Sequence, residues 1–124
     1  RYGIPGASTK PGPLRTPAGH HIVEFPLSTK GVLGLRVPVS GGGYFRLMPY
    51  GLYRWGLRRV NGRDAQPGMF YFHPWEIDPG QPRVEGAPLR SRLRHYTNLG
   101  TMEARLRRLL GDFRWGRIDE VFDV

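Results

Sequence analysis

The sequence has no cysteine and no apolar run that approaches the roughly 18 residues of a membrane span. The absence of cysteine excludes a disulfide framework, a thiolate nucleophile and a cysteine-based zinc site. No basic and apolar leader opens the chain, which begins at Arg1 and continues as if in the middle of a loop. We therefore expect a piece of a longer protein, and the sequence indicates no compartment for it.

Lysine is also scarce, since only two of the 19 basic residues are lysine and the rest are arginine. Against 10 acidic residues they give a formal net charge of +9. Clustered arginines can bind phosphate, but here they are scattered and acidic residues stand near them. Charge alone therefore does not predict a nucleic-acid-binding face, and we expect no nucleic-acid partner.

Glycine and proline, in contrast, are abundant, with 18 and 12 residues in a chain of 124. The length fits one small domain with a modest core, and the turn-forming residues predict long ordered loops. We expect residues 1–48 to be loop-rich, with an irregular segment over 1–19, a short strand over 21–25 and a broken strand over 31–39. The sequence "SGGGYFR" should form the turn that follows.

Two amphipathic helices are predicted in residues 49–124. Pro49 can begin the first, over 49–60, in which apolar side chains recur at helical spacing. The second helix is predicted over 102–110, where Thr101 can cap it and Gly111 ends it.

Two strands are predicted around the second helix. The run 69–73 has no polar alternation, which is typical of a strand covered on both faces, as in a parallel sheet flanked by helices. The sequence "FRWGRI", residues 113–118, predicts a last short strand, followed by a turn. Strands and helices that alternate in this way indicate an α/β fold.

His73 follows the apolar run directly, so it lies at the carboxyl end of the predicted strand, where α/β folds place their chemistry. Pro74 favours an extended backbone there, and Trp75 can shield one side of the ring. An imidazole that titrates near neutral pH suits a proton donor or acceptor. A histidine that merely hydrogen-bonds its loop fits the same pattern, so both interpretations stay open.

The glycine run before the first helix also allows two interpretations. Its backbone could pass beneath a ligand while Tyr44 and Arg46 project over it, which would suit a sugar. A tight loop that leads into the helix explains the glycines equally well.

Other polar residues do not predict a metal site. His20 and His21 are adjacent, so on a strand their rings point to opposite faces. The spacing of Glu76 and Asp78 is common in surface loops. We expect His95 to help pack a loop before the second helix.

Seven blocks in order resemble the C-terminal half of the polysaccharide deacetylases with a NodB homology domain, and more narrowly the subfamily associated with exosortase and exopolysaccharide loci. The resemblance covers nearly the whole chain, and the blocks are "YGIPGA", "EFPLST", "GGGYFRLMPY", "YFHPWEIDP", "QPRV", "RHYTNLG" and "EARLRRLLGDFRW". It implies an α/β fold that is the C-terminal portion of a distorted (β/α) barrel. It also implies a hydrolase that removes N-acetyl groups from an amino-sugar polymer in exopolysaccharide biosynthesis.

The resemblance further implies roles for individual residues. In that family an Asp and two His hold a divalent metal, usually zinc, an Asp acts as base, and a late histidine protonates the leaving amine. His73 corresponds to that histidine, and Tyr71 stands where a leucine usually lines the acetyl pocket, which leaves the acyl preference open. Substrate contacts are implied for Tyr71, Trp75, Tyr44, Arg46 and Gly43.

The blocks that carry the metal ligands and the base are absent from this chain. We therefore expect a C-terminal fragment that needs the missing N-terminal half of the same domain, binds no metal alone and is inactive alone. The alternative is a free-standing carbohydrate-binding or accessory module without catalysis.

Overall fold

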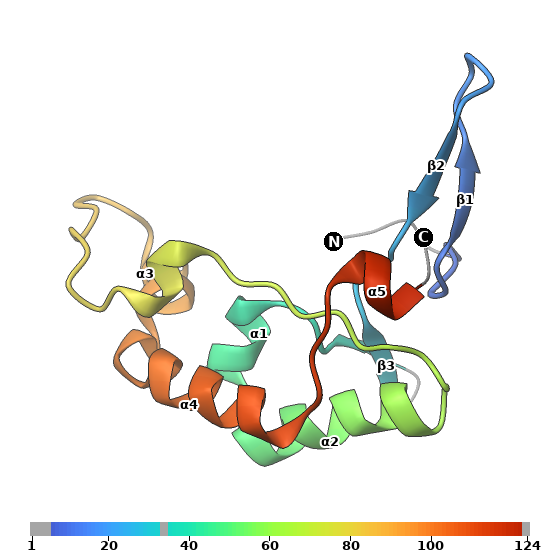
Figure 1. The fold of residues 1–124 in the computed structure, drawn as a ribbon. Helices are drawn as coiled ribbons and strands as arrows, with labels where there is room; N and C mark the ends of the chain where they lie inside the picture. Colours follow the sequence, from blue (N-terminus) through green and yellow to red (C-terminus); the bar gives the residue numbers. More distant parts are fainter. Residues whose placement is uncertain (1–5, 33–34, 123–124) are drawn as a thin grey trace.

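The structure, a computed structural model, describes residues 6–32 and 35–122. It is a mixed α/β arrangement of short strands followed by helices (Figure 1). In chain order its elements are β1 (Gly12–Arg15), β2 (His21–Glu24), β3 (Thr29–Val32), β4 (Leu35–Pro38), α1 (Gly42–Leu47), α2 (Tyr50–Gly62), the 3-10 helix η1 (Pro74–Ile77), α3 (Leu89–Tyr96), α4 (Leu99–Asp112) and α5 (Ile118–Phe122). None of the described helices is long and apolar enough to span a membrane.

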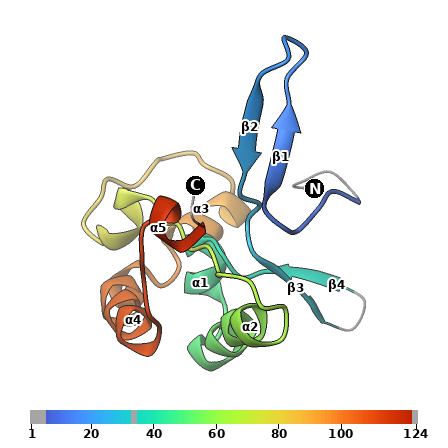
Figure 2. The same cartoon turned by 45° about the vertical axis from the view of Figure 1, so that its right-hand side comes forward.

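The strands form two separate antiparallel hairpins. In the first, β1 pairs with β2 so that Leu14 lies opposite Ile22; in the second, β3 pairs with β4. The β1–β2 hairpin projects away from the helices, as Figures 1 and 2 both show. The predicted strand 21–25 is confirmed as β2, whereas β1 lies in the segment that was expected to be irregular. The predicted broken strand 31–39 belongs to the second hairpin, and residues 33–34 lie outside the described residues.

Both predicted amphipathic helices are confirmed as α2 and α4; α2 nearly matches its predicted bounds, and α4 extends beyond the predicted range 102–110 at both ends. They enclose the core together with α1, and its fully buried side chains are Phe45, Tyr53, Leu57, Met102 and Leu109. The start of α4 differs from the prediction, since the helix begins at Leu99 after Asn98, which adopts a left-handed conformation with φ of 59°. Thr101 therefore lies inside the first turn and donates its hydroxyl to the Asn98 carbonyl at 3.1 Å.

The predicted strand 69–73 is wrong in extent. This segment forms one parallel bridge, between Gly41 and Tyr71, in which the Tyr71 N–H donates to Ser40 at 2.8 Å and Tyr71 accepts from Gly42 at 2.9 Å. The pairing stops there because its partner enters α1 at Gly42. The burial that this apolar run predicted is found in part, since Phe70 and Phe72 are partly buried against the core.

The predicted strand 113–118 is also wrong. Residues 113–117 have no regular structure, and the expected final turn is the helix α5. Phe122 in α5 packs against Phe25 with a ring-centroid distance of 4.6 Å, so this end of the chain is joined to the segment that follows β2.

Candidate functional site

The glycine run lies against the segment that contains His73. A Cβ atom on Gly41 would stand 3.0 Å from the Tyr71 hydroxyl oxygen, and one on Gly42 would stand 2.3 Å from the Glu76 carboxylate oxygen Oε2. Real Cβ atoms do not approach so closely, so a side chain at Gly42 would displace Glu76. The glycines thus permit the close backbone approach that the sequence predicted, and what approaches them is part of the protein itself.

Glu76 is the centre of this contact. It is 1% exposed and lies on η1, and its carboxylate accepts hydrogen bonds from the His73 N–H at 2.9 Å and from Arg46 Nε at 3.1 Å. The Glu76 N–H in turn donates to the His73 carbonyl at 2.9 Å. These reciprocal bonds resemble a capping box and fix the turn that begins with His73.

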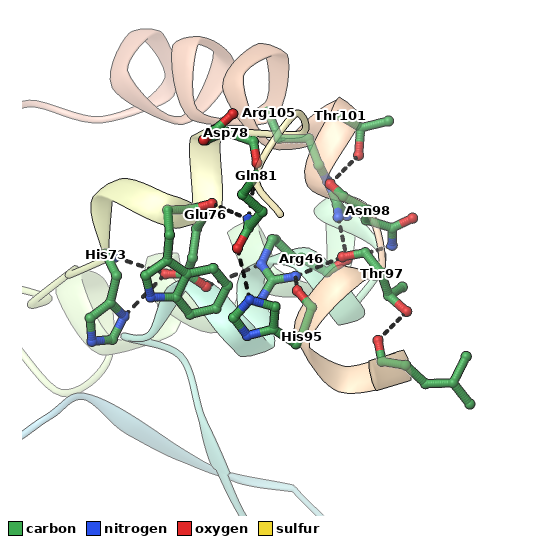
Figure 3. Close-up of polar contacts among 12 residues, drawn as sticks. Arg46, His73, Glu76, Asp78, Gln81, His95, Thr97, Asn98, Thr101 and Arg105 are labelled. Carbon is green, nitrogen blue, oxygen red and sulfur yellow. Dashed lines mark hydrogen bonds and ion pairs between the residues drawn. The ribbon is translucent and has the colours of Figure 1, made fainter. Parts of the chain in front are cut away.

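Arg46 compensates the buried charge of Glu76. Its side chain is also 1% exposed, and Nη1 donates to the carbonyls of His95 at 2.9 Å and Thr97 at 2.7 Å (Figure 3). The guanidinium therefore joins α1, η1 and the connection from α3 to α4. Its buried position differs from the predicted projection over a ligand, and the substrate contact expected of Arg46 remains a prediction.

His73 stands at the open edge of this network. Its side chain is 57% exposed, and Nδ1 lies 3.4 Å from Glu76 Oε2 (Figure 3). Within the described part of the chain, no residue hydrogen-bonds its other ring nitrogen, Nε2. The site thus presents an exposed imidazole that has a buried carboxylate on one side and a free nitrogen on the other.

Aromatic rings flank this imidazole. The Trp75 ring is nearly parallel to it at a centroid distance of 5.7 Å, and the Tyr71 ring meets it edge-on at 5.8 Å. Trp75 also stacks on His95 at 4.1 Å, and the Arg46 guanidinium carbon lies 5.2 Å from the indole centroid. These contacts restrict Trp75, which in turn limits the orientations open to His73.

The tautomer of His95 follows from its neighbour Gln81. The Gln81 amide nitrogen donates to the carbonyls of Trp75 at 2.8 Å and Asp78 at 2.9 Å, so its oxygen is the atom that faces His95 Nε2 at 2.9 Å. An amide oxygen only accepts, and His95 Nε2 therefore carries a proton. The packing role expected for His95 is confirmed, although it lies on α3, a helix that was not predicted.

The structure therefore brings His73, Tyr71 and Trp75 together. Tyr44 is 49% exposed on α1, and a Cβ on Gly43 would meet no atom within 4 Å. Among the described residues, Tyr44 forms no ring contact with His73 or Trp75. The substrate-binding roles of Tyr44 and Gly43 remain predictions.

Sequence reasoning missed Glu76 as a member of the site. A local signal was present. Pro74 is typical of the first position of a helix, which makes His73 the N-cap residue, and an acid three residues after the N-cap, here Glu76, is the pattern of a capping box. The partnership with Arg46 had no such local signal.

The described residues contain no group of three or more His, Cys, Asp or Glu side chains that could hold a metal ion. Among them, His20, His21 and Asp78 are exposed. Since the described residues provide no such group, we derive no step through a metal centre in this chain.

Comparison with known proteins gives one match. Residues 1–123 match the family described as "Domain of unknown function (DUF3473)", so the chain belongs to this family. No curated protein and no solved structure matches the chain.

Proposed function

We propose that this member of the family is the proton-donating part of a hydrolase that removes N-acetyl groups from an amino-sugar polymer. The missing N-terminal half of the same domain would supply the divalent metal site, usually zinc in the proteins it resembles, and the base. It would also complete the (β/α) barrel. The observation that carries the proposal is the exposed His73 ring, whose Nδ1 lies 3.4 Å from a buried carboxylate while Nε2 is free among the described residues.

The chemistry assigned to this chain is one proton transfer. Protonated His73 donates from Nε2 to the amide nitrogen as the carbon–nitrogen bond breaks, so that the product leaves as a neutral amine and the imidazole becomes neutral. Nδ1 lies on the side of Glu76, whose carboxylate holds the ring in this orientation. Since Arg46 compensates Glu76, the carboxylate stays in place when His73 loses its charge.

The rings beside His73 support a sugar substrate. Sugars stack on aromatic faces, and Tyr71, which is 41% exposed, lies edge-on to the imidazole within reach of a bound molecule. Tyr71 occupies the position that usually shapes the acetyl pocket in the proteins that the sequence resembles. Its larger side chain should restrict the acyl group that is accepted.

The test is His73→Ala in the polypeptide that joins this chain to the missing half of its domain. We expect turnover on an N-acetylated oligosaccharide to fall by about 10²- to 10⁴-fold, the usual contribution of a general acid, with metal content and substrate binding nearly unchanged. The alkaline limb of the pH–rate profile should also vanish, because it reports loss of the imidazolium proton.

The matched control is His21→Ala, which removes an exposed imidazole from the β1–β2 hairpin. It should leave turnover unchanged. Loss of metal from the His73 variant would show that this residue is a metal ligand. Unchanged turnover would show that His73 has no catalytic role and only stabilises its loop.

A carbohydrate-binding or accessory module is the second candidate, favoured by the partly exposed rings of Tyr44 and Tyr71. In that case the chain alone should bind an amino-sugar oligomer, and replacing either tyrosine with alanine should weaken binding. His73→Ala would leave that binding unchanged, and the joined polypeptide would release no acetate.

A further inference from the structure

Helix α2 has an outer face that the core does not use. Its inner face buries Tyr53, Gly56, Leu57 and Val60. Its outer face carries a hollow of about 290 Å³ lined by Gly51, Arg54, Trp55, Arg58 and Arg59. These positions recur every three or four residues, so they form one stripe along the helix.

Gly51 and Trp55 both line the hollow. Gly51 has no side chain, and a Cβ there would meet no atom within 4 Å, which leaves space one turn before Trp55. Trp55 is 41% exposed, and the Arg59 guanidinium carbon lies 5.1 Å from its ring centroid. The Arg59 cation thus lies over the indole of Trp55, which is still partly exposed at the surface.

The charge of this face is only partly compensated. Asp112, at the end of α4, pairs with Arg54 at 3.1 Å and lies 3.9 Å from Arg108, so one carboxylate serves two arginines. Neither Arg58 nor Arg59 forms an ion pair with any residue in 6–32 or 35–122. Arg59 lies over the indole and Arg58 lines the same hollow, so two guanidinium groups without an ion pair among the described residues stand at this face.

We propose that this outer face of α2 binds an acidic sugar unit of a polysaccharide, with the ring against Trp55 and its carboxylate or sulfate on Arg58 and Arg59. Guanidinium groups bind such anions in bidentate geometry, and the apolar face of a sugar matches an indole. The site lies outside the group around His73. It therefore goes beyond the proposed function and does not depend on it.

The size of the face favours a sugar over the two other polyanions that a basic surface can bind. A protein that binds a duplex tightly makes roughly six to ten phosphate contacts, whereas this face offers two arginines that form no ion pair among the described residues. Anchoring at a lipid surface needs a broad apolar face, and α2 already turns most of its apolar side chains into the core. One ring and two cations match one acidic sugar unit.

The test measures binding of tetragalacturonate to the protein by calorimetry at about 50 mM and about 200 mM NaCl, since salt screens exposed charges. We expect measurable binding that weakens with salt. Trp55→Ala should weaken it about tenfold, the effect of one lost aromatic contact, and the double variant Arg58→Gln with Arg59→Gln, which removes two charged contacts, should weaken it at least as much. Gly51→Leu should also weaken it, by filling the hollow without a change in charge.

Weaker binding by Gly51→Leu could not be explained by unfolding, because replacing a helical glycine by leucine should raise the stability of the helix. The charge control is Arg90→Gln with Arg94→Gln, which removes two exposed charges from α3 and should change binding less than twofold. An equal loss in this control would overturn the proposal, because net charge alone would then explain binding. So would absence of tetragalacturonate binding, or tighter binding of oligo(dT) or of phosphatidylglycerol vesicles that depends on Trp55.

Discussion

Glu76 and Arg46 lose nearly all contact with water, so each depends on the other for charge compensation. Removing one partner of a buried ion pair costs about 3–5 kcal/mol, because the other charge stays buried and uncompensated. We expect Glu76→Gln to lower the free energy of unfolding in urea by about 3 kcal/mol. Glu103→Gln is the matched control, since Glu103 pairs with Arg107 at 2.8 Å on an exposed helix face. It should cost under about 0.5 kcal/mol, and equal losses would contradict the role given to Glu76.

Gly42 tests the same contact from the other side. A methyl group there would meet Glu76 Oε2 at 2.3 Å. This oxygen accepts from the His73 N–H and the other carboxylate oxygen accepts from Arg46, so a shift of the carboxylate would disturb these bonds. We expect Gly42→Ala to lower the free energy of unfolding by about 1–3 kcal/mol, the range for overpacking. Gly43→Ala is the control, because a Cβ there meets nothing within 4 Å. A Gly42 variant as stable as the Gly43 variant would show that the carboxylate can move freely.

Whether a site residue could be predicted depends on whether its contacts are close to it in the sequence. His73, Tyr71 and Trp75 could be found from the sequence because they follow one another along a single extended segment. The inward position of Arg46 could not be predicted, since its partners are Glu76 and two carbonyls around residue 96, all distant along the chain. An arginine near glycines looks the same in sequence whether it faces a ligand or a buried acid.

Among the elements, α2 and α4 are joined by a polar contact at their ends. The Tyr50 hydroxyl donates to Asp112 Oδ2 at 2.5 Å, and Arg54 pairs with the same oxygen at 3.1 Å. Burial and the bond to Asp112 raise the pKa of Tyr50 to about 12. The Tyr50 hydroxyl, followed by the nearby arginines, holds the pKa of Asp112 below its usual value.

This contact predicts a pH dependence of stability. A carboxyl group whose pKa is lower in the folded state stabilises the fold above the unfolded pKa of about 3.9 and loses that contribution as pH falls through the folded pKa. We expect Asp112→Asn to be less stable than the wild type near pH 7, with a difference that shrinks as pH falls below the unfolded pKa of about 3.9 and through the lower folded pKa. Urea unfolding across this range checks it, with Asp78→Asn as an exposed control. A constant difference would mean that the charge of Asp112 contributes nothing.

Element prediction succeeded where side chains recur over a long stretch. Helices α2 and α4 have 13 and 14 residues, which is enough for apolar periodicity to stand out. Helix α1 has six residues and begins in glycines, and α5 has five, so neither contains two full turns of pattern. Helix α3 has eight residues, and its apolar positions Leu89 and Leu93, one turn apart, form too short a pattern to stand out.

The predicted strand 69–73 shows a different limit. Its apolar pattern correctly indicated burial, because Phe70 packs on Phe45 at a centroid distance of 5.3 Å. A strand also needs a partner of matching length, and the only partner in the described residues turns into α1 after one pair. Pattern predicts burial, whereas the length of a strand depends on a neighbour that the pattern does not contain.

Over the described part of the molecule, large apolar side chains are buried in a small core or exposed at the surface, and the β1–β2 hairpin carries some of the exposed ones. Phe45, Tyr53 and Leu57 are at most 1% exposed, whereas Leu14 and Ile22 on the β1–β2 hairpin are 50% and 56% exposed. Two-stranded hairpins are at best marginally stable in water, and Figures 1 and 2 show this one extending from the helices. The hairpin should therefore contribute little to the cooperative unfolding of the helical part.

Replacing both Leu14 and Ile22 by threonine tests whether the hairpin contributes to the unfolding of the helical part. The two residues face each other across the hairpin, and threonine keeps a high strand propensity while removing apolar surface. We expect the melting temperature followed by circular dichroism to change by less than about 2 °C, whereas Leu57→Ala should cost about 2–5 kcal/mol. Binding of a hydrophobic dye should fall in the threonine variant, because exposed apolar patches bind such dyes. Leu14 and Ile22 are about half exposed, so in a hairpin that stands apart from the core they bury too little apolar area to cause a large loss of stability. A melting temperature that falls as far as in Leu57→Ala would therefore mean that the hairpin folds as part of the core.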